Sequence, residues 1–341
     1  MKASILLIYT GGTIGMKNNP ETGALSPFDF NDIYDEFPTL RKLDVDIEVL
    51  SFKPIDSSNV TPELWVKLAR IIRDNYAAFD GFVILHGTDT MAYTASALSF
   101  MIENLDKPVV FTGSQIPIGV LRTDGRENLI TAVEIAAAKQ DGRSIVPEVC
   151  IYFQNKLFRA NRTTKHSAEQ LNAFRSDNYP ALAEVGVNIH YNTPFIHRSE
   201  CLPAAPTIST HLETGIEIVK IFPGMRPSTL ESMLSVPDIR GIVLETYGSG
   251  NAPTAEWFVR AVGDALARGL LVVNVTQCPG GSVSMNLYET GKCLQQAGVV
   301  SGRDITTEAA VTKMMYLLGQ NRSPEWTRER MNVSIRGEMT L

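Results

Sequence analysis

The chain has 341 residues, of which 44% are apolar and 20% are charged, and this is the composition of a folded globular protein. A chain of this length is expected to form two domains rather than one. Its formal charge is −6, from 31 basic and 37 acidic side chains, so it has no general attraction for phosphate backbones or anionic lipid. We therefore expect no nucleic-acid partner and no membrane partner.

The first residues indicate a buried strand rather than a targeting signal. One lysine and a short apolar run lead into the polar sequence Thr10–Thr13, without the features of a signal peptide. No apolar stretch approaches the length of a transmembrane helix. The cysteines are far apart and form no CxxC pair, which predicts neither a zinc site nor a redox dithiol: Cys150, Cys201, Cys278 and Cys293. These features predict a cytoplasmic protein.

Strand-like and helix-like segments alternate along the first half of the chain. Short apolar runs predict buried strands at Ser4–Tyr9, Ile47–Phe52, Gly81–Leu85, Pro108–Thr112 and Val149–Phe153. Helical patterns follow Thr61, with Pro62 at the first helical position, and span Met91–Glu103 and Glu127–Ala138. This alternation predicts right-handed βαβ crossovers and a mostly parallel sheet covered on both faces.

The alternation breaks between residues 191 and 212, where prolines and a loss of periodicity predict a linker. Residues 1–190 would then form a larger N-terminal α/β domain, and residues 213–341 a smaller C-terminal α/β domain. The second domain is expected to contain strands at Ile216–Ile221, Gly241–Glu245 and Leu270–Val275, and helices near Ser228–Leu234, Ala255–Ala267 and Thr307–Leu318. The predicted fold class is two α/β domains with mostly parallel sheets.

The segments that follow the predicted strands are the candidate site, because ligands of open α/β sheets bind beyond the carboxyl ends of the strands. These segments carry small hydroxyl, amide and carboxylate groups: Thr10–Gly15, Asp56–Asn59, His86–Thr90 and Gly113–Gln115. Such groups suit a small polar zwitterion better than a large apolar ligand. The glycines in the first segment match neither nucleotide-binding motif.

Two threonines are candidate nucleophiles. Glycines before Thr13 would let a substrate approach closely, although an ordinary tight turn is the simpler interpretation. Thr88 could serve as a nucleophile or a proton relay, and Asp89 could hold an ammonium group, or the segment could merely cap the next helix. His86 is interpreted as a buried structural residue.

Lys165 is a candidate base, since a buried lysine can activate a hydroxyl, although a lone lysine is usually a solvated surface charge. The five histidines show no metal-binding spacing, so no metal is expected.

Together these segments resemble the bacterial-type asparaginases. Ile8–Gly15 and Gly81–Met91 look like the two signature segments of that family. The resemblance covers essentially the whole chain, through Asp56–Ser58, Gly113–Pro117, Arg122–Gly125, Asn161–Lys165, Tyr247–Pro253 and Thr276–Cys278. The amino acids within these motifs are similar to those of the cytoplasmic type I branch.

The resemblance implies hydrolysis of L-asparagine to L-aspartate and ammonia without a cofactor. It implies that Thr13 is the nucleophile and that Thr88, Asp89 and Lys165 form a supporting hydroxyl–carboxylate–lysine group. It also implies a homotetramer whose active sites lie between domains of different subunits. The expected substrate contacts are Ser57, Ser58, Asp89, Gly12, Ser114 and, from a neighbouring subunit, Asn251.

Two departures from the family pattern bear on mechanism and regulation. The stretch Thr22–Pro27 lacks the tyrosine that family members often place near the nucleophile, so the group that deprotonates Thr13 is left open. Glu245 stands where some type I members carry a basic residue of a regulatory asparagine site, which argues against such regulation here.

Three other functions stay open at this point. An enzyme of the same fold could act mainly on glutamine. The amidotransferase subunit that works on misacylated tRNA shares the fold but would need an additional N-terminal domain, whereas the first motif begins at residue 10. A non-catalytic amino-acid-binding module would need Asp89 but not Lys165.

Overall fold

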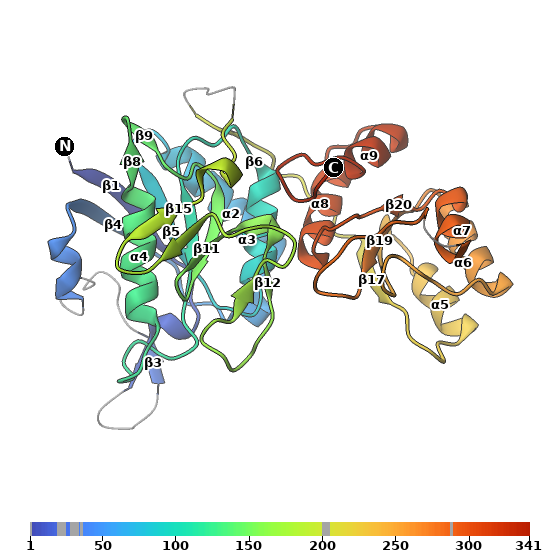
Figure 1. Ribbon diagram of the computed structural model, residues 1–341, viewed down its shortest axis with the longest axis horizontal. Coiled ribbons are helices and arrows are strands. Elements are labelled where there is room, and N and C mark those ends of the chain that lie inside the picture. Colours follow the sequence, from blue (N-terminus) through green and yellow to red (C-terminus); the bar gives the residue numbers. More distant parts are fainter. Residues whose placement is uncertain (1, 19–24, 28–33, 35–36, 200–204, 287–288) are drawn as a thin grey trace. The chain divides into compact units, whose positions relative to one another are not determined.

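The computed structural model describes residues 2–18, 25–27, 34, 37–199, 205–286 and 289–341 (Figure 1). They form two compact units, Met1–Ile208 and Ser209–Leu341. Within the described residues, no helix is both long enough and apolar enough to cross a membrane. Cys150, Cys278 and Cys293 are free thiols, and Cys201 lies outside the described residues.

The first unit is built on an eight-stranded sheet with the order β15-β14-β11-β10-β7-β5-β1-β4. Its strands are β1 (Ala3–Tyr9), β4 (Val45–Ser51), β5 (Gly81–Leu85), β7 (Val109–Thr112), β10 (Val149–Phe153), β11 (Lys156–Arg159), β14 (Ala183–Val185) and β15 (Ile189–Tyr191). The five strands from β4 to β10 are parallel, and the remaining three are antiparallel. The predicted mostly parallel sheet is confirmed.

Helices cover both faces of this sheet, as the continuous apolar strands require. Helix α4 (Gly125–Ala137) packs on one face, where Leu129 and Val133 join Leu7 and Val83 in the core. Helices α2 (Pro62–Asn75) and α3 (Met91–Met101) lie together on the other side of the sheet (Figure 1).

The first unit also contains short two-stranded sheets. They pair β2 (Met16–Asn18) with β3 (Leu25–Pro27), β6 (Ile102–Glu103) with β16 (Thr207–Ile208), β8 (Lys139–Gln140) with β9 (Arg143–Ser144), and β12 (Thr164–Lys165) with β13 (Phe174–Arg175). The 3-10 turns are η1 (Thr13–Gly15), η3 (Pro38–Lys42), η4 (Ser57–Asn59), η5 (Ala160–Arg162) and η6 (Thr193–Phe195).

The second unit has an all-parallel sheet of β17 (Ile216–Lys220), β18 (Gly241–Thr246), β19 (Leu271–Thr276) and β20 (Val300–Ser301), in that order. Its helices are α5 (Pro227–Leu234), α6 (Glu256–Ala267), α7 (Glu289–Ala297), α8 (Thr307–Gly319) and α9 (Pro324–Met331). Side chains of α5 and α6, such as Leu230, Phe258 and Val262, share one core with the sheet, and α8 packs against β17 and β18.

The structure differs from the sequence-based expectation at the end of α3 and in the predicted linker. Helix α3 ends at Met101 rather than Glu103, because Ile102 and Glu103 pair with β16. Residues 191–199 and 205–208, expected as the first part of a linker, belong to the first unit. Their backbone is bonded to a buried ion pair: Glu148 accepts from the N–H of His197, and Arg159 donates to the carbonyl of Phe195.

Candidate active site

The strand order places a topological switch point at β1. The chain runs from β1 to its neighbour β4 and then returns to the opposite side of β1 as β5. In open α/β sheets the loops diverge at such a point and leave a crevice at the carboxyl ends of the strands. The loops that follow β1 and β5 carry Thr13 and Thr88. The switch point therefore brings the two predicted threonines to the same edge of the sheet.

Thr13 opens η1, directly after two glycines with left-handed backbones. Gly12 has φ +90°, and a methyl group added there would come within 2.5 Å of the Gly87 Cα. Only glycine permits this contact, so the loops of Thr13 and Thr88 touch through their glycines. Thr13 is half-buried, and its hydroxyl makes no hydrogen bond to any residue that the structure describes. The hydroxyl is thus free to meet a ligand.

His86 is a structural residue, as the sequence predicted. It is fully buried between two partners: Nδ1 lies 2.7 Å from the carbonyl of Gly87, and Nε2 lies 3.0 Å from the hydroxyl of Thr94. Burial lowers the pKa of His86 from 6.5 to about 4, partly opposed by the Gly87 carbonyl. The ring is therefore neutral at physiological pH, and its position fixes the loop that continues to Thr88.

Lys165 joins the catalytic candidates of the β5 loop. It lies in β12, and its Nζ donates to Thr88 Oγ1 at 2.8 Å and to Asp89 Oδ1 at 2.7 Å. The lysine side chain is only 17% exposed, whereas that of Asp89 is 64% exposed. The predicted hydroxyl–carboxylate–lysine group therefore exists as one hydrogen-bonded unit. Its carboxylate faces solvent, where it can receive a charged substrate group.

The capping role considered for Thr90 is not what the structure shows. Thr90 stands at the N-cap position of α3 without a side-chain capping bond. Its hydroxyl instead donates to the carbonyl of Ser57 at 2.7 Å, which ties the β5 loop to η4.

The two serines of η4 differ in their surroundings. Ser57 is buried, and a methyl group added at Gly87 would lie 2.7 Å from its Oγ. Ser58 donates from both its N–H and its hydroxyl to Asp56, at 2.9 and 2.7 Å, and these two bonds lower the pKa of Asp56. The Ser58 hydroxyl would have to leave Asp56 to donate to a ligand. Ser57 is therefore the better placed of the two.

The loop after β7 adds two more polar groups. Ser114 is buried, and its Oγ has no hydrogen-bond partner among the described residues. Buried hydroxyls are rarely left without a partner, so this group is available to a ligand or a water molecule. Gln115 accepts from the Thr88 hydroxyl at 3.1 Å. The β7 loop is thus bonded to the Thr88–Lys165 group.

Sequence reasoning assigned no role to the residues that hold this loop. Asp124, buried at the start of α4, accepts from the backbone N–H groups of Gln115 and Ile116 at 3.0–3.1 Å. Asn128, one turn later, donates to the carbonyl of Gly113 and to Asp124. The sequence signal that could have found them was Asp124 itself, which precedes the glycine that begins α4. It lies in the segment Arg122–Gly125, which carries part of the family resemblance.

Two other features named in the sequence analysis are Asn251 and the stretch Thr22–Pro27. Asn251 belongs to the second unit, where its backbone pairs with Tyr247 in the turn after β18. In the stretch Thr22–Pro27, residues 22–24 lie outside the described residues. Within the part of the chain that the structure describes, no three histidine, cysteine or acidic side chains gather in a way that could hold a metal ion.

Comparison with known proteins decides the family. Residues 4–197 match the family described as "Asparaginase, N-terminal", and residues 215–331 match "Glutaminase/Asparaginase C-terminal domain". The chain belongs to the asparaginase family. The resemblance found in the sequence motifs is thereby confirmed.

Individual relatives agree over the whole chain. The chain is 42% identical to L-asparaginase 1 of Escherichia coli (strain K12), over 99% of this chain and 98% of that protein. It matches the crystal structure of L-asparaginase I from Vibrio cholerae with a TM-score of 0.89 and 40% identity, over 100% of both chains. It is also 40% identical to the 60 kDa lysophospholipase of Mus musculus, of which it spans 62%. The asparaginase fold therefore covers both units.

Proposed function

We propose that this member of the asparaginase family hydrolyses L-asparagine to L-aspartate and ammonia through an acyl-enzyme on Thr13. The observation that supports the proposal most strongly is the hydrogen-bonded group of Lys165, Thr88 and Asp89, which meets the Thr13 loop through Gly12 and Gly87. Amide hydrolysis needs a nucleophile, a proton donor for the leaving ammonia and donors for the oxyanion. This edge of the sheet supplies groups for each of these tasks.

Substrate binding would use the short polar groups around Thr13. The exposed carboxylate of Asp89 attracts the α-ammonium group, and Ser57 donates to the α-carboxylate. Ser114, buried without a described partner, is available to the side-chain amide. A peptide has neutral amides in place of these charges and offers no ammonium group to the exposed Asp89 carboxylate, so a free amino acid is preferred.

In the proposed reaction, Thr13 Oγ attacks the side-chain carbonyl carbon and passes its proton toward the departing nitrogen. The C–N bond breaks, ammonia leaves, and a β-aspartyl ester remains on Thr13. A water molecule, oriented by Thr88 and Lys165, then cleaves this ester and releases aspartate. Thr13 is the preferred nucleophile because the Thr88 hydroxyl is already bonded to Lys165 and Gln115.

We also propose a homotetramer in which Asn251 of a neighbouring subunit completes the site. This proposal rests on the family resemblance and on the position of Asn251 in a turn at the carboxyl end of β18. Light scattering of the active protein should give the mass of four chains. A fully active monomer would contradict it. A cytoplasmic location likewise remains a prediction from the sequence.

The direct test of the proposed activity is ammonia release from L-asparagine and from L-glutamine. We expect kcat/KM to be at least about 100-fold higher for asparagine, because one extra methylene displaces the amide from Thr13 and a misplacement of about 1 Å can cost that much. Equal kcat/KM values would favour the glutaminase alternative. Saturable asparagine binding without ammonia release would favour the binding module.

A further inference from the structure

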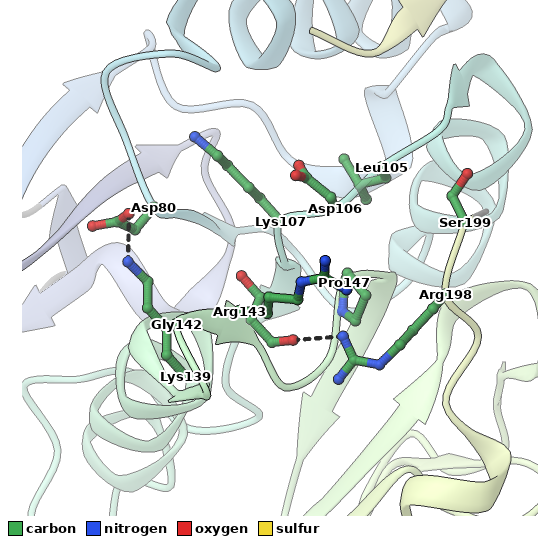
Figure 2. A pocket seen from close by; sticks show the side chains of 11 residues that line it. Asp80, Leu105, Asp106, Lys107, Lys139, Gly142, Arg143, Pro147, Arg198 and Ser199 are labelled. Atoms are coloured by element: carbon green, nitrogen blue, oxygen red, sulfur yellow. Dashed lines mark hydrogen bonds and ion pairs between the residues drawn. The ribbon is translucent and has the colours of Figure 1, made fainter. Parts of the chain in front are cut away.

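A second polar cavity lies at the opposite end of the same strands. It has a volume of about 170 Å³ and is lined by residues that precede β5, β7 and β10, together with Arg198 and Ser199, which follow η6 (Figure 2). The candidate active site lies instead beyond the carboxyl ends of β1, β5 and β7. The charged side chains of the cavity are Asp80, Asp106, Lys107, Lys139, Arg143 and Arg198. None of them has a role in the proposed reaction.

Two of the arginines have no carboxylate partner. Arg198 donates from Nη1 to the carbonyl of Ser144 at 3.0 Å and from Nη2 to that of Ile145 at 2.9 Å, so neutral acceptors hold its guanidinium in place. Arg143, at the start of β9, has no hydrogen-bond or ion-pair partner among the described residues. A guanidinium has five N–H donors, and Arg198 uses two of them. Both groups can therefore donate to an anion.

The other charges of the cavity are already engaged. Lys139 forms an ion pair with Asp80 at 2.7 Å. Lys107 donates to the carbonyls of Tyr76 and Phe79, just after α2. Asp106, which precedes Lys107 in the sequence, accepts from the hydroxyl of Tyr76 through its carboxylate. Among the described residues, the lining thus has four cationic and two anionic side chains. The excess of two positive charges corresponds to the two arginines.

The walls of the cavity separate these groups. In Figure 2, Leu105, Asp106 and Lys107 line one wall, and Arg143, Pro147 and Arg198 line the opposite one. Leu105 and Pro147 are buried apolar residues, whereas Arg143 and Arg198 are exposed. Charge-assisted hydrogen bonds from a guanidinium to an anion are stronger than hydrogen bonds between neutral groups. The arginine wall therefore suits a compact doubly charged ion.

We propose that this cavity binds a phosphate group through Arg143 and Arg198. A phosphate dianion matches the two unpaired positive charges, and its oxygens match the planar N–H pairs of a guanidinium. A single carboxylate would neutralise only one of them. The volume leaves room beyond the phosphate for a small organic substituent, so the source is free phosphate or a small phosphomonoester.

The test is isothermal calorimetry on the whole protein, with inorganic phosphate and glycerol 3-phosphate as ligands and succinate as a dicarboxylate comparison. Arg143→Gln and Arg198→Gln should each weaken phosphate-group binding by about tenfold or more, because each removes a charge-assisted contact. Arg260→Gln is the matched control, since this exposed residue of α6 lies outside the cavity and its loss changes the net charge equally. Its affinity should equal that of the parent protein.

The outcomes separate the possibilities. Binding of both phosphates that is lost in the two cavity variants supports a site for the free ion, and binding of the ester alone supports the phosphomonoester. Succinate binding as tightly as phosphate, affinity unchanged in the cavity variants, or no saturable heat would each overturn the proposal. No asparagine is present in this measurement, so its result is independent of the proposed hydrolysis.

Discussion

Lys165 Nζ lies 2.8 Å from Thr88 Oγ1, although 77 positions separate the two residues in the sequence. The short sheet of β12 and β13 carries the lysine, and the loop after β5 carries the threonine. A second bond at 2.7 Å, from Nζ to Asp89, fixes the direction of the ammonium group. This arrangement makes Lys165 the residue whose loss should affect proton transfer most while leaving the strands unchanged.

Replacement of Lys165 by Met should lower kcat by about 100- to 10,000-fold, the usual range for a residue that transfers protons. Asparagine binding should persist, because Asp89 and Ser57 remain. Steady-state kinetics and equilibrium binding of asparagine measure the two effects. Lys156→Met is the matched control, since Lys156 forms an exposed pair with Glu184 at 3.6 Å. A Lys165→Met enzyme with normal kcat would remove this residue from the mechanism.

His86 should remain neutral throughout the physiological pH range. Burial lowers its pKa to about 4 from the ordinary 6.5, so the folded protein disfavours the added proton. The resulting stability is present above pH 6.5 and is lost as the pH falls from 6.5 toward 4. NMR of the imidazole ring, assigned with His86→Gln, should show no titration between pH 5.5 and 8, a window chosen from these values. A midpoint near 6.5 would contradict the burial argument.

Lys313 should be essential to the stability of the second unit. This fully buried residue of α8 donates to the carbonyls of Met331 and Val333 and pairs with Glu338 at 2.6 Å, which joins α8 to the end of the chain. Lys313→Met leaves a buried carboxylate without its cation and should cost about 3–5 kcal/mol in the free energy of unfolding. The same change at exposed Lys156 should cost less than about 1 kcal/mol.

Denaturant unfolding followed by tryptophan fluorescence measures this difference, because Trp257 and Trp326 lie in the second unit. Burial alone would raise the pKa of Glu338, but Lys313 and the N–H groups of Ile335 and Arg336 outweigh it and lower that pKa. The contribution is therefore present above the ordinary value of 4.5 and is lost as the pH falls below it. Equal unfolding midpoints for the two lysine variants would show that the buried pair is dispensable.

Asparagine saturation should be hyperbolic or only weakly cooperative. Glu245 of β18 accepts from the hydroxyl of Thr307 at 2.7 Å and lies 3.4 Å from Lys220. The carboxylate of Glu245 would repel the carboxylate of a second asparagine, whereas a basic residue at this position would attract it. Cooperativity requires an effector that binds two states of the protein with different affinities, and this repulsion weakens such binding. Initial rates over a wide range of asparagine concentrations give the Hill coefficient. A strongly sigmoidal curve would show that another arrangement rebuilds a regulatory site.

Sequence patterns predicted the central strands well because these strands are continuous apolar runs bounded by turns. β5 has the predicted bounds, and all five of its residues are buried. The antiparallel strands β11, β14 and β15 were not predicted. They are short, and the hairpin between β10 and β11 turns at Gln154 and Asn155, both with positive φ, without a glycine to mark it.

The candidate site shows a similar division. Strand ends identified Thr13, Thr88 and Asp89, because polar residues at those positions follow directly from a parallel sheet. The residues alone made Lys165 a candidate base but did not distinguish it from a surface lysine, and the family resemblance then favoured the catalytic role. The support from Asp124 and Asn128 was missed, since a buried carboxylate that binds loop N–H groups looks in sequence like an ordinary helix cap.

The most direct test of the proposed mechanism is to identify the residue that carries the acyl group. The enzyme would be mixed with L-asparagine, quenched in acid, digested and analysed by mass spectrometry, with Thr13→Ala and Thr88→Ala variants treated in parallel. We expect a β-aspartyl group on the peptide that contains Thr13, and no acylation of the Thr13→Ala variant. A label confined to the peptide that contains Thr88 would contradict it and would reverse the roles of the two threonines.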